Sequence, residues 1–216
     1  MKMIGWGMVL LALAGCAGPP RAPDWQINAR DALERQIKAF MSGESRVEQA
    51  EFDKARRELE STGQPGLVAR AELQRCALRV ATLTFEPCEG FERLRADAPA
   101  AERAYADYLA GRITPPQVPL LPAKYHAVAG GREDVLAVRA IADPVSRLVA
   151  AGVLARGGRA STEVVTLAAE TASQQGWRRA LLAWLPVQAQ RAERAGAVEE
   201  AERLRRRIAL VAKGGW

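Results

Sequence analysis

The stretch DPVSRLVAAGVLARGG, residues 143–158, carries the start, one apolar face and the end of an α-helix. Asp143 can accept hydrogen bonds from the first free backbone N–H groups, and Pro144 fits the first helical position, where no N–H is needed. Apolar residues then recur at intervals of three and four, which is the spacing of one helical face. Gly157 and Gly158 follow, as is common where a helix ends. The stretch therefore predicts a helix buried along one side.

Three more helices are predicted after this one, and together the four make two successive helix-turn-helix hairpins. The second begins at Ser161 or Thr162. The third begins at Trp177 and is expected to bend at Pro186. The fourth follows Gly196, and its apolar residues share one helical face. These residues are Val198, Ala201, Leu204, Ile208 and Val211.

The two hairpins begin at Pro144 and Trp177, which are 33 residues apart, a period typical of helical repeat proteins. The last hairpin resembles a tetratricopeptide unit, because Ala201 falls where that motif has a small residue. The hairpin departs from the motif at two positions: Arg205 stands where the motif has an aromatic residue, and Gln188 stands where it has a leucine. The resemblance covers one hairpin of about four. The sequence predicts an all-α fold. Its helical hairpins form either a degenerate tetratricopeptide-like solenoid, which the resemblance implies, or an irregular helical bundle.

The N-terminal part of the chain is also predicted to be helical. Patterning starts at Asp24, which is expected to cap the first helix, and that helix ends at Gly43. A second helix runs to Gly63. Pro65 opens a third, because proline is tolerated in the first helical turn.

The middle of the chain, residues 84–131, is less regular and rich in proline. Only residues 99–109 are expected to form a firm helix there, with Pro99 in its first turn. Gly130 and Gly131 mark a candidate boundary. The domain prediction is a single all-α domain over 24–216, with candidate subregions 24–130 and 131–216.

The first twenty residues, MKMIGWGMVLLALAGCAGPP, have the pattern of an export signal. Lys2 gives a positive start, and the apolar run after it is too short for a permanent transmembrane helix. The tetrad Leu13-Ala14-Gly15-Cys16 resembles the lipobox of bacterial lipoproteins, in which the cysteine is lipidated and becomes the first mature residue. The resemblance implies a signal peptide over residues 1–15 and a lipidated tether over 16–23. The other interpretation is an anchor helix or secretory signal in which Cys16 is incidental.

Ala17 indicates the membrane in which such a lipoprotein would remain. In this class an aspartate after the lipidated cysteine retains the protein in the inner membrane, so Ala17 implies lipid anchoring in the outer membrane, facing the periplasm. The net charge is +6, and loses one unit with Lys2. This excess is typical of an arginine-rich, GC-rich genome, or of a surface that meets anionic phospholipid, lipopolysaccharide or peptidoglycan. The compartment excludes nucleic acid as a partner.

Cys76 and Cys88 remain as a pair once Cys16 carries lipid. An even number of cysteines in an oxidising compartment predicts a disulfide, here between a helix and the loop that follows it. A zinc site is disfavoured, because His126 is the only histidine and a four-ligand site would need carboxylates as well.

No residue constellation predicts catalysis, and no metal or cofactor is expected. His126 stands alone, without a nucleophile motif. Glu44 followed by Ser45 is similar to the catalytic segment of lytic transglycosylases, but the Gly-Leu-Met-Gln type segment of that family is absent. A helix-capping role for these two residues is sufficient.

Several charged and aromatic residues have both a structural and a binding interpretation. The basic run 203–207 is expected to be neutralised by the pairs Glu199–Arg203 and Glu202–Arg206 on one helix face. Aromatic and apolar residues either pack in the core or line a groove for a partner peptide. The candidate partner-binding residues are Trp177, Leu181 and Trp184, with Tyr105 and Tyr108 as a second pair.

These features predict an outer-membrane lipoprotein that acts as a periplasm-facing adaptor or scaffold for an envelope protein complex. Helical-repeat lipoproteins of similar size serve in secretion, pilus and outer-membrane assembly machines, and the chain looks like that general class. The alternative is a peptidoglycan-acting enzyme or a regulator of one. Exposed carboxylates in a deep cleft would favour the enzyme, and an apolar groove lined by helical hairpins would favour the adaptor.

Overall fold

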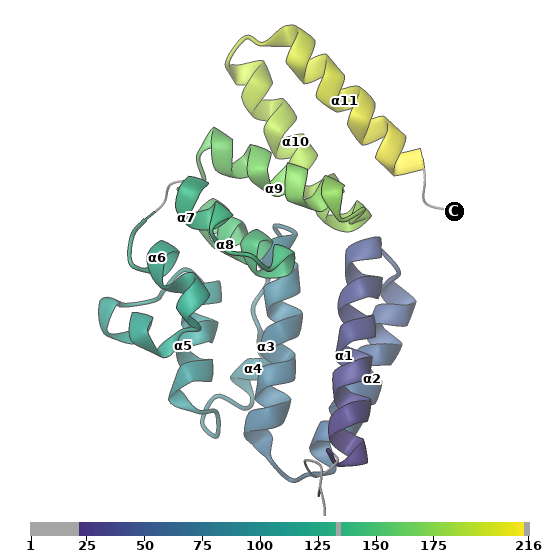
Figure 1. Cartoon of the computed structure of the whole chain (residues 1–216), viewed down its shortest axis with the longest axis vertical. Coiled ribbons are helices and arrows are strands. Elements are labelled where there is room, and N and C mark those ends of the chain that lie inside the picture. Colours follow the sequence, from purple (N-terminus) through teal and green to yellow (C-terminus); the bar gives the residue numbers. More distant parts are fainter. Residues whose placement is uncertain (1–21, 133–134, 214–216) are drawn as a thin grey trace, which may run out of the picture.

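The computed structural model describes residues 22–132 and 135–213, and within them every regular element is a helix (Figure 1). The all-α prediction is therefore confirmed. The α-helices are Asp24–Ser42 (α1), Ser45–Glu60 (α2), Pro65–Ala81 (α3), Glu89–Glu92 (α4), Ala100–Leu109 (α5), His126–Ala129 (α6), Val135–Arg139 (α7), Pro144–Arg156 (α8), Thr162–Gln174 (α9), Arg178–Arg194 (α10) and Val198–Lys213 (α11). Two short 3-10 helices, Pro115–Leu120 (η1) and Ala123–Tyr125 (η2), lie between α5 and α6.

The residues predicted to begin and end α8, and to begin α9, do so in the structure. The carboxylate of Asp143 accepts a hydrogen bond from the backbone N–H of Ser146 at 2.8 Å, and Pro144 is the first residue of α8. The hydroxyl of Ser161 accepts from the backbone N–H of Val164 at 3.3 Å and caps α9. Gly158 after α8 has the left-handed backbone conformation that glycine adopts without strain.

Three predicted helix starts differ from the structure by one residue. Pro23, not Asp24, occupies the N-cap position of α1, and Asp24 is the first helical residue. Pro99 precedes α5 as its N-cap residue, and Trp177 precedes α10 in the same way. Proline is compatible with the N-cap positions of α1 and α5, because the backbone N–H of an N-cap residue is not needed for a hydrogen bond within the helix.

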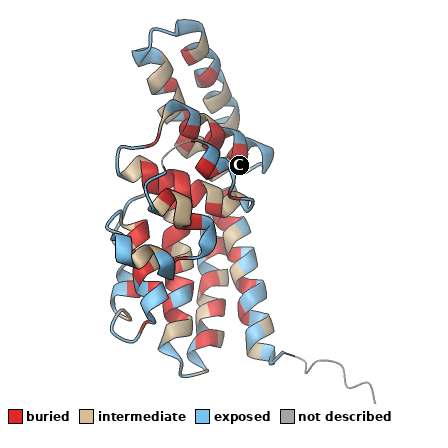
Figure 2. Ribbon diagram, turned by 60° about the vertical axis from the view of Figure 1, so that its left-hand side comes forward, coloured by how far each residue is buried: buried red, intermediate tan, exposed pale blue. Residues whose placement is uncertain are grey.

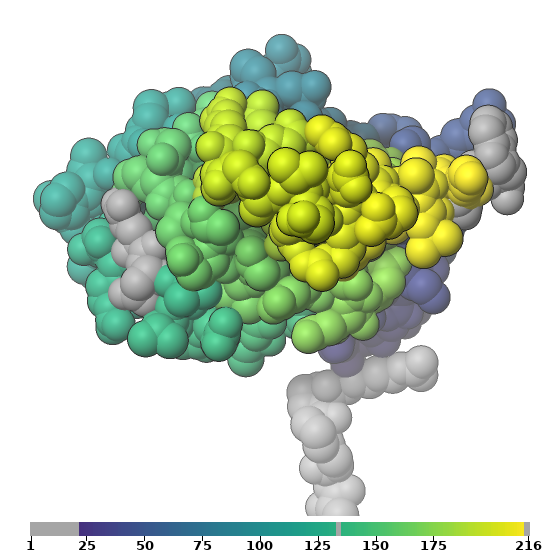
Figure 3. Space-filling view, turned by 90° about the horizontal axis from the view of Figure 1, so that it is seen from above, coloured from purple at the N-terminus to yellow at the C-terminus, as the bar shows by residue number. Residues whose placement is uncertain are grey.

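The helices pack in pairs along the chain. α1 lies against α2 over their whole length, and α9, α10 and α11 follow one another as successive neighbours (Figure 1). α11 ends the stack, and the view from above shows it on the outer surface of this end (Figure 3). This arrangement of successive neighbours is that of a repeat array.

α3 is the central helix, and two close contacts join it to the C-terminal half. Gly152 on α8 faces the backbone of Val80 on α3, and a Cβ at Gly152 would overlap the Val80 carbonyl group. The indole N–H of Trp184 on α10 donates a hydrogen bond to the carbonyl oxygen of Ala81 at 2.9 Å. Trp184 is fully buried.

α10 also returns to the first hairpin. Arg179 donates a hydrogen bond to the hydroxyl of Ser45 at 2.8 Å, and its guanidinium lies 4.5 Å from the centroid of the Phe40 ring. These contacts join helices that are not neighbours in sequence, as in a bundle. The fold therefore combines a stack of hairpins in its C-terminal half with bundle-like packing around α3.

The core is continuous across the candidate boundary at Gly130. One buried cluster includes residues from Phe40 to Leu204 and draws on both halves of the chain. Buried residues gather on the facing sides of the helices, while the outer sides are exposed (Figure 2).

Candidate binding groove

The groove is an apolar cavity of about 550 Å³ bounded by α1, α3, α5, α8 and the 3-10 helices. Its position follows from the fold, because α3 packs against both α5 and α8, and the proline-rich segment with η1 and η2 closes one side. The volume lies within the range of pockets that hold small ligands or several side chains. The apolar lining includes Ile37, Leu73, Ala77, Leu121, Val145 and Val149.

A cluster of three tyrosines lies at one side of the groove, and two of them, Tyr105 and Tyr125, form part of its wall. The ring of Tyr125 lies 5.6 Å from that of Tyr105 and 5.1 Å from that of Tyr108, between centroids. The hydroxyls of Tyr105 and Tyr125 are 3.4 Å apart, and both residues line the groove. Burial raises the pKa of all three phenols above its ordinary value, so they stay neutral into the alkaline range. The wall therefore offers aromatic surface and neutral hydroxyls.

The two carboxylates that line the groove already have partners. Arg70 donates to one oxygen of Glu102 from Nε at 3.0 Å and from Nη2 at 2.7 Å. Asp143 caps α8, accepting from both the backbone N–H and the hydroxyl of Ser146. Lys124 also lines the groove, with its ammonium 5.5 Å from the centroid of the Tyr125 ring. The rim therefore presents the positive charge of Lys124 beside an Arg70–Glu102 pair that compensates itself.

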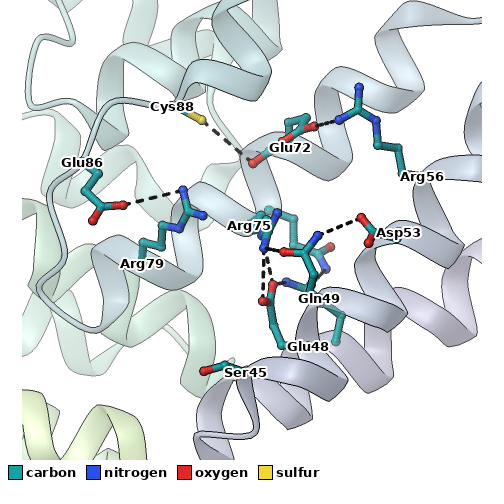
Figure 4. Close-up of polar contacts among 12 residues, drawn as sticks. Ser45, Glu48, Gln49, Asp53, Arg56, Glu72, Arg75, Arg79, Glu86 and Cys88 are labelled. Atoms are coloured by element: carbon teal, nitrogen blue, oxygen red, sulfur yellow. Dashed lines mark hydrogen bonds and ion pairs between the residues drawn. The ribbon is translucent and has the colours of Figure 1, made fainter.

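Outside the groove, a buried polar network joins the first three helices (Figure 4). Glu48 on α2 accepts from Nε of Arg75 at 3.0 Å and from the side-chain amide of Gln36 at 2.9 Å. Arg75 also donates to Gln49, and its guanidinium lies 4.5 Å from the centroid of the Phe52 ring. A buried carboxylate with this many donors is a structural element that fixes α1 and α2 on α3.

The predicted disulfide is present. Cys76 on α3 and Cys88 in the following loop are bonded, with their Cα atoms 5.9 Å apart. Disulfides form and persist in oxidising compartments, so this bond is typical of an extracytoplasmic domain. Cys16 lies outside the described residues.

Two of the three candidate partner-binding residues belong to the core. Trp184 is fully buried and hydrogen-bonded to Ala81, and Leu181 is 8% exposed. Of the two interpretations left open by the sequence, core packing is therefore the one that these two side chains adopt. Trp177 is half-buried and packs against the same core.

The remaining candidates have structural contacts. Nε2 of His126 is 2.8 Å from the carbonyl oxygen of Leu121, to which it can donate, and so links α6 to the groove segment. Glu44 occupies the N-cap position of α2 without a side-chain capping bond, and the hydroxyl of Ser45 accepts from Arg179. The capping role expected of this pair is therefore wrong.

The basic run on α11 is paired differently from the prediction. Arg203 forms an ion pair with Glu200, three residues before it, and Arg205 pairs with Glu193 on α10 at 2.7 Å. The second pair joins the two helices of the last hairpin, which the sequence alone did not indicate.

Neither a membrane span nor a metal cluster is found in the described part of the chain. No helix there is long and apolar enough to cross a bilayer. No three histidine, cysteine, aspartate or glutamate side chains in residues 22–132 and 135–213 are grouped to hold a metal ion.

Sequence reasoning missed the residues of the groove that lie between α5 and α8. Tyr125 and Leu121 belong to the irregular segment, where no periodicity marks a buried side. The available signal was the sequence TPPQVPLLPAKY, residues 114–125, in which apolar and aromatic residues follow closely spaced prolines. Such a segment is rigid and can form the wall of a pocket without regular structure.

Comparison with protein-family models, with curated proteins and with solved structures gives no match for this chain.

Proposed function

We propose that the protein is an outer-membrane lipoprotein whose helical domain faces the periplasm and binds a segment of another envelope protein in the groove. The observation that carries this proposal is the apolar groove between α1, α3, α5 and α8. A groove of this kind, lined by several helices, is a recurring mode of peptide recognition.

The chemistry of the groove specifies the occupant, which is an apolar segment with an acidic residue beside it. Each large apolar side chain buried there would contribute roughly 1.5–3 kcal/mol. Tyr105 and Tyr125 offer hydroxyls to polar groups of the segment. Lys124 on the rim favours a negative charge next to the apolar residues, because the charge of Arg70 is already paired with Glu102.

The anchor rests on the sequence Leu13-Ala14-Gly15-Cys16 and on Ala17 after it. The disulfide between Cys76 and Cys88 supports placement outside the cytoplasm. Helical structure starts at Asp24, so few residues separate the lipidated cysteine from the domain. An adaptor on so short a tether acts close to the membrane.

The alternative function is a peptidoglycan-acting enzyme or a regulator of one. Hydrolysis of a glycosidic bond needs two carboxyl groups free to act on substrate. Glu102 is bound by Arg70 and Asp143 by Ser146, which favours the adaptor.

The test is photo-crosslinking in cells from a photoreactive residue at Ala101, an exposed position that lines the groove. Ala209, exposed on α11, is the matched control. Crosslinking from Ala101 and not from Ala209 is expected. Mass spectrometry should place the crosslink in an apolar segment of one envelope protein, with a carboxylate nearby.

A synthetic peptide of that segment then measures binding directly. Leu120→Asp, at the exposed edge of the groove, should weaken binding about tenfold or more, because it places a charge where an apolar contact forms. Leu210→Asp makes the same change on α11 and should leave binding unchanged.

Three results would overturn the adaptor proposal. One is crosslinking from Ala209 equal to that from Ala101. Another is peptide binding that is unaffected by Leu120→Asp. The third is turnover of peptidoglycan by the purified protein that is lost in Glu102→Gln, which would establish the enzyme.

A further inference from the structure

A second cavity, of about 390 Å³, lies under the disulfide loop on the other side of α3 from the groove. Helical periodicity places Cys76 and Arg79 on the opposite face of α3 from Arg70 and Gln74, which line the groove. Cys76 and Cys88 both line this cavity, and the disulfide between them fixes the loop that contains Cys88 to α3 at the cavity wall. The two cavities therefore lie on different sides of α3 and share only Leu73 in their linings.

Four arginines and three carboxylates line this cavity. Two of the arginines are tied to carboxylates. Arg95 forms ion pairs with Glu92 at 2.6 Å and with Asp107 at 3.2 Å, and Arg112 pairs with Asp107 at 3.3 Å. These three contacts neutralise much of one wall.

The other two arginines, Arg79 and Arg156, are only loosely compensated. Arg79 is 4.0 Å from a carboxylate oxygen of the exposed Glu86, which is too long for a hydrogen bond. Arg156 has no carboxylate partner within 4.0 Å among the described residues, and its guanidinium lies 5.4 Å from the centroid of the Phe85 ring. Both guanidinium groups therefore keep donors available inside a partly enclosed space.

We propose that this cavity binds a phosphate group, with Arg79 and Arg156 as the residues that contact it. Guanidinium groups bind phosphate through two parallel hydrogen bonds, and a site with an excess of arginine favours a group that carries more than one negative oxygen. Phe85, Val80 and Leu109 provide apolar surface beside the arginines, where the acyl part of a lipid would lie. The ligand is free phosphate or the headgroup of a lipid, which share this chemistry.

Calorimetric titration of the purified protein distinguishes these sources. The probes are inorganic phosphate, octyl phosphate, and octyl glucoside, which has the same chain without phosphate. All three are used below the concentration at which the amphiphiles form micelles. Saturable binding of octyl phosphate and no binding of octyl glucoside are expected. Equal affinity for inorganic and octyl phosphate supports a free phosphate, and tighter binding of octyl phosphate supports a lipid headgroup.

Variants identify the contact residues. Arg79→Gln and Arg156→Gln should each weaken octyl phosphate binding about tenfold or more, because each removes a charged donor. Arg156→Lys keeps the charge but loses the two-pronged geometry, so an intermediate loss is expected. Arg206→Gln makes the same charge change on the exposed face of α11 and should bind as the wild type does. Circular dichroism establishes that each variant is folded.

Binding of octyl glucoside as tight as that of octyl phosphate would overturn the proposal, as would an equal loss of affinity in Arg206→Gln and Arg156→Gln. Absence of any phosphate binding to the folded wild type would do the same. Leu120→Asp in the groove should leave phosphate binding unchanged, so this proposal and the adaptor function fail independently.

Discussion

At the scale of single residues, the most unusual concentration is that of tyrosine. The chain has three tyrosines, and the rings of Tyr105, Tyr108 and Tyr125 form one cluster beside the groove. Burial raises the pKa of each phenol. No hydrogen-bond partner of the Tyr108 hydroxyl is found among the described residues. The folded protein therefore binds the phenol protons more tightly than the unfolded chain does, and folding favours the neutral form of every tyrosine.

The first prediction concerns this coupling at alkaline pH. Unfolded tyrosine ionises near its ordinary pKa of about 10, while the folded phenols stay protonated above it. The free energy of unfolding should therefore be constant with respect to these groups below about pH 10 and should fall as pH rises further. Near-ultraviolet absorbance of tyrosinate should rise only together with the loss of helical circular dichroism.

Tyr108→Phe provides the control for this experiment. It removes one of three phenols, so the dependence of unfolding free energy on pH at the alkaline end should become shallower by about a third. Tyrosinate absorbance that appears at its ordinary pH while the helices remain intact would contradict the prediction.

The second prediction concerns the disulfide. Cys88→Ser should lower the free energy of unfolding by about 2–4 kcal/mol, since the bond closes a short loop and restricts the unfolded chain. Helical content should be retained, because α3 and α5 do not depend on the loop for their own hydrogen bonds. Urea denaturation checks the stability. Wild type measured with reductant should match the variant, and an oxidised wild type no more stable than Cys88→Ser would refute the prediction.

At the scale of secondary-structure elements, the crossing of α3 and α8 organises the centre of the fold. Gly152 allows the two backbones to approach closely at Val80, and Trp184 from α10 caps the same end of α3. A glycine inside a helix costs about 1 kcal/mol in helix propensity relative to alanine. Here that cost is offset by close packing.

The third prediction follows from this crossing. Gly152→Ala improves helix propensity, but its Cβ would overlap the Val80 carbonyl group and force α3 and α8 apart. We expect a net loss of about 1–2 kcal/mol in the free energy of unfolding, because overpacking of this kind costs about 1–3 kcal/mol. Urea denaturation measures it. Gly66→Ala, where the nearest atom is Pro99 Cδ at 3.3 Å, is the matched control and should change stability less. A Gly152→Ala protein as stable as the wild type would show that the crossing can relax.

The sequence predicted those elements whose signals are local. The helix starts predicted at Asp143 and Ser161 are confirmed. Such starts can be recognised in the sequence because the capping residue and the backbone N–H that it binds are only three residues apart. The short helices α4 and α6 were not predicted, since each is four residues long and has no apolar period to detect. The same limit applies to η1 and η2, which depend on proline and on packing against α5 and α8.

The groove and the polar network depend on contacts between distant residues, which one sequence does not reveal. Glu48 and Arg75 are 27 residues apart, and neither has a local pattern that selects the other. Trp184 was a candidate for either core or contact, and only the position of Ala81 decides for the core. Tyr105 was noted as an aromatic residue, but its partner Tyr125 lies on a different element.

At the scale of the whole molecule, the N-terminal half of α10 holds the domain together. Trp184 reaches α3 and Arg179 reaches the start of α2, so the C-terminal stack and the first hairpin share a core. The groove lies between elements from both halves of the chain. Its shape is therefore a property of the complete domain.

The fourth prediction concerns the attachment of this domain to the membrane. We expect wild type to sediment with outer-membrane fractions in a density gradient and Cys16→Ser to be released, because two or three acyl chains provide stable anchoring. Cys88→Ser removes a different cysteine and should remain with the membrane. Mass spectrometry of the N-terminal peptide should find a lipidated Cys16. An unmodified Cys16, or a chain that still begins at Met1, would contradict the lipoprotein interpretation.

The hydrogen bond from Trp184 to Ala81 also determines when the protein can fold. The two residues are separated by 103 positions, and a chain made from its N-terminus exposes the open end of α3 until α10 has followed. Contacts of such long sequence separation slow folding relative to a linear repeat array, in which each hairpin can pack as soon as it is complete. Newly made chains of this protein therefore pass through a period in which helices have formed and the core has not closed.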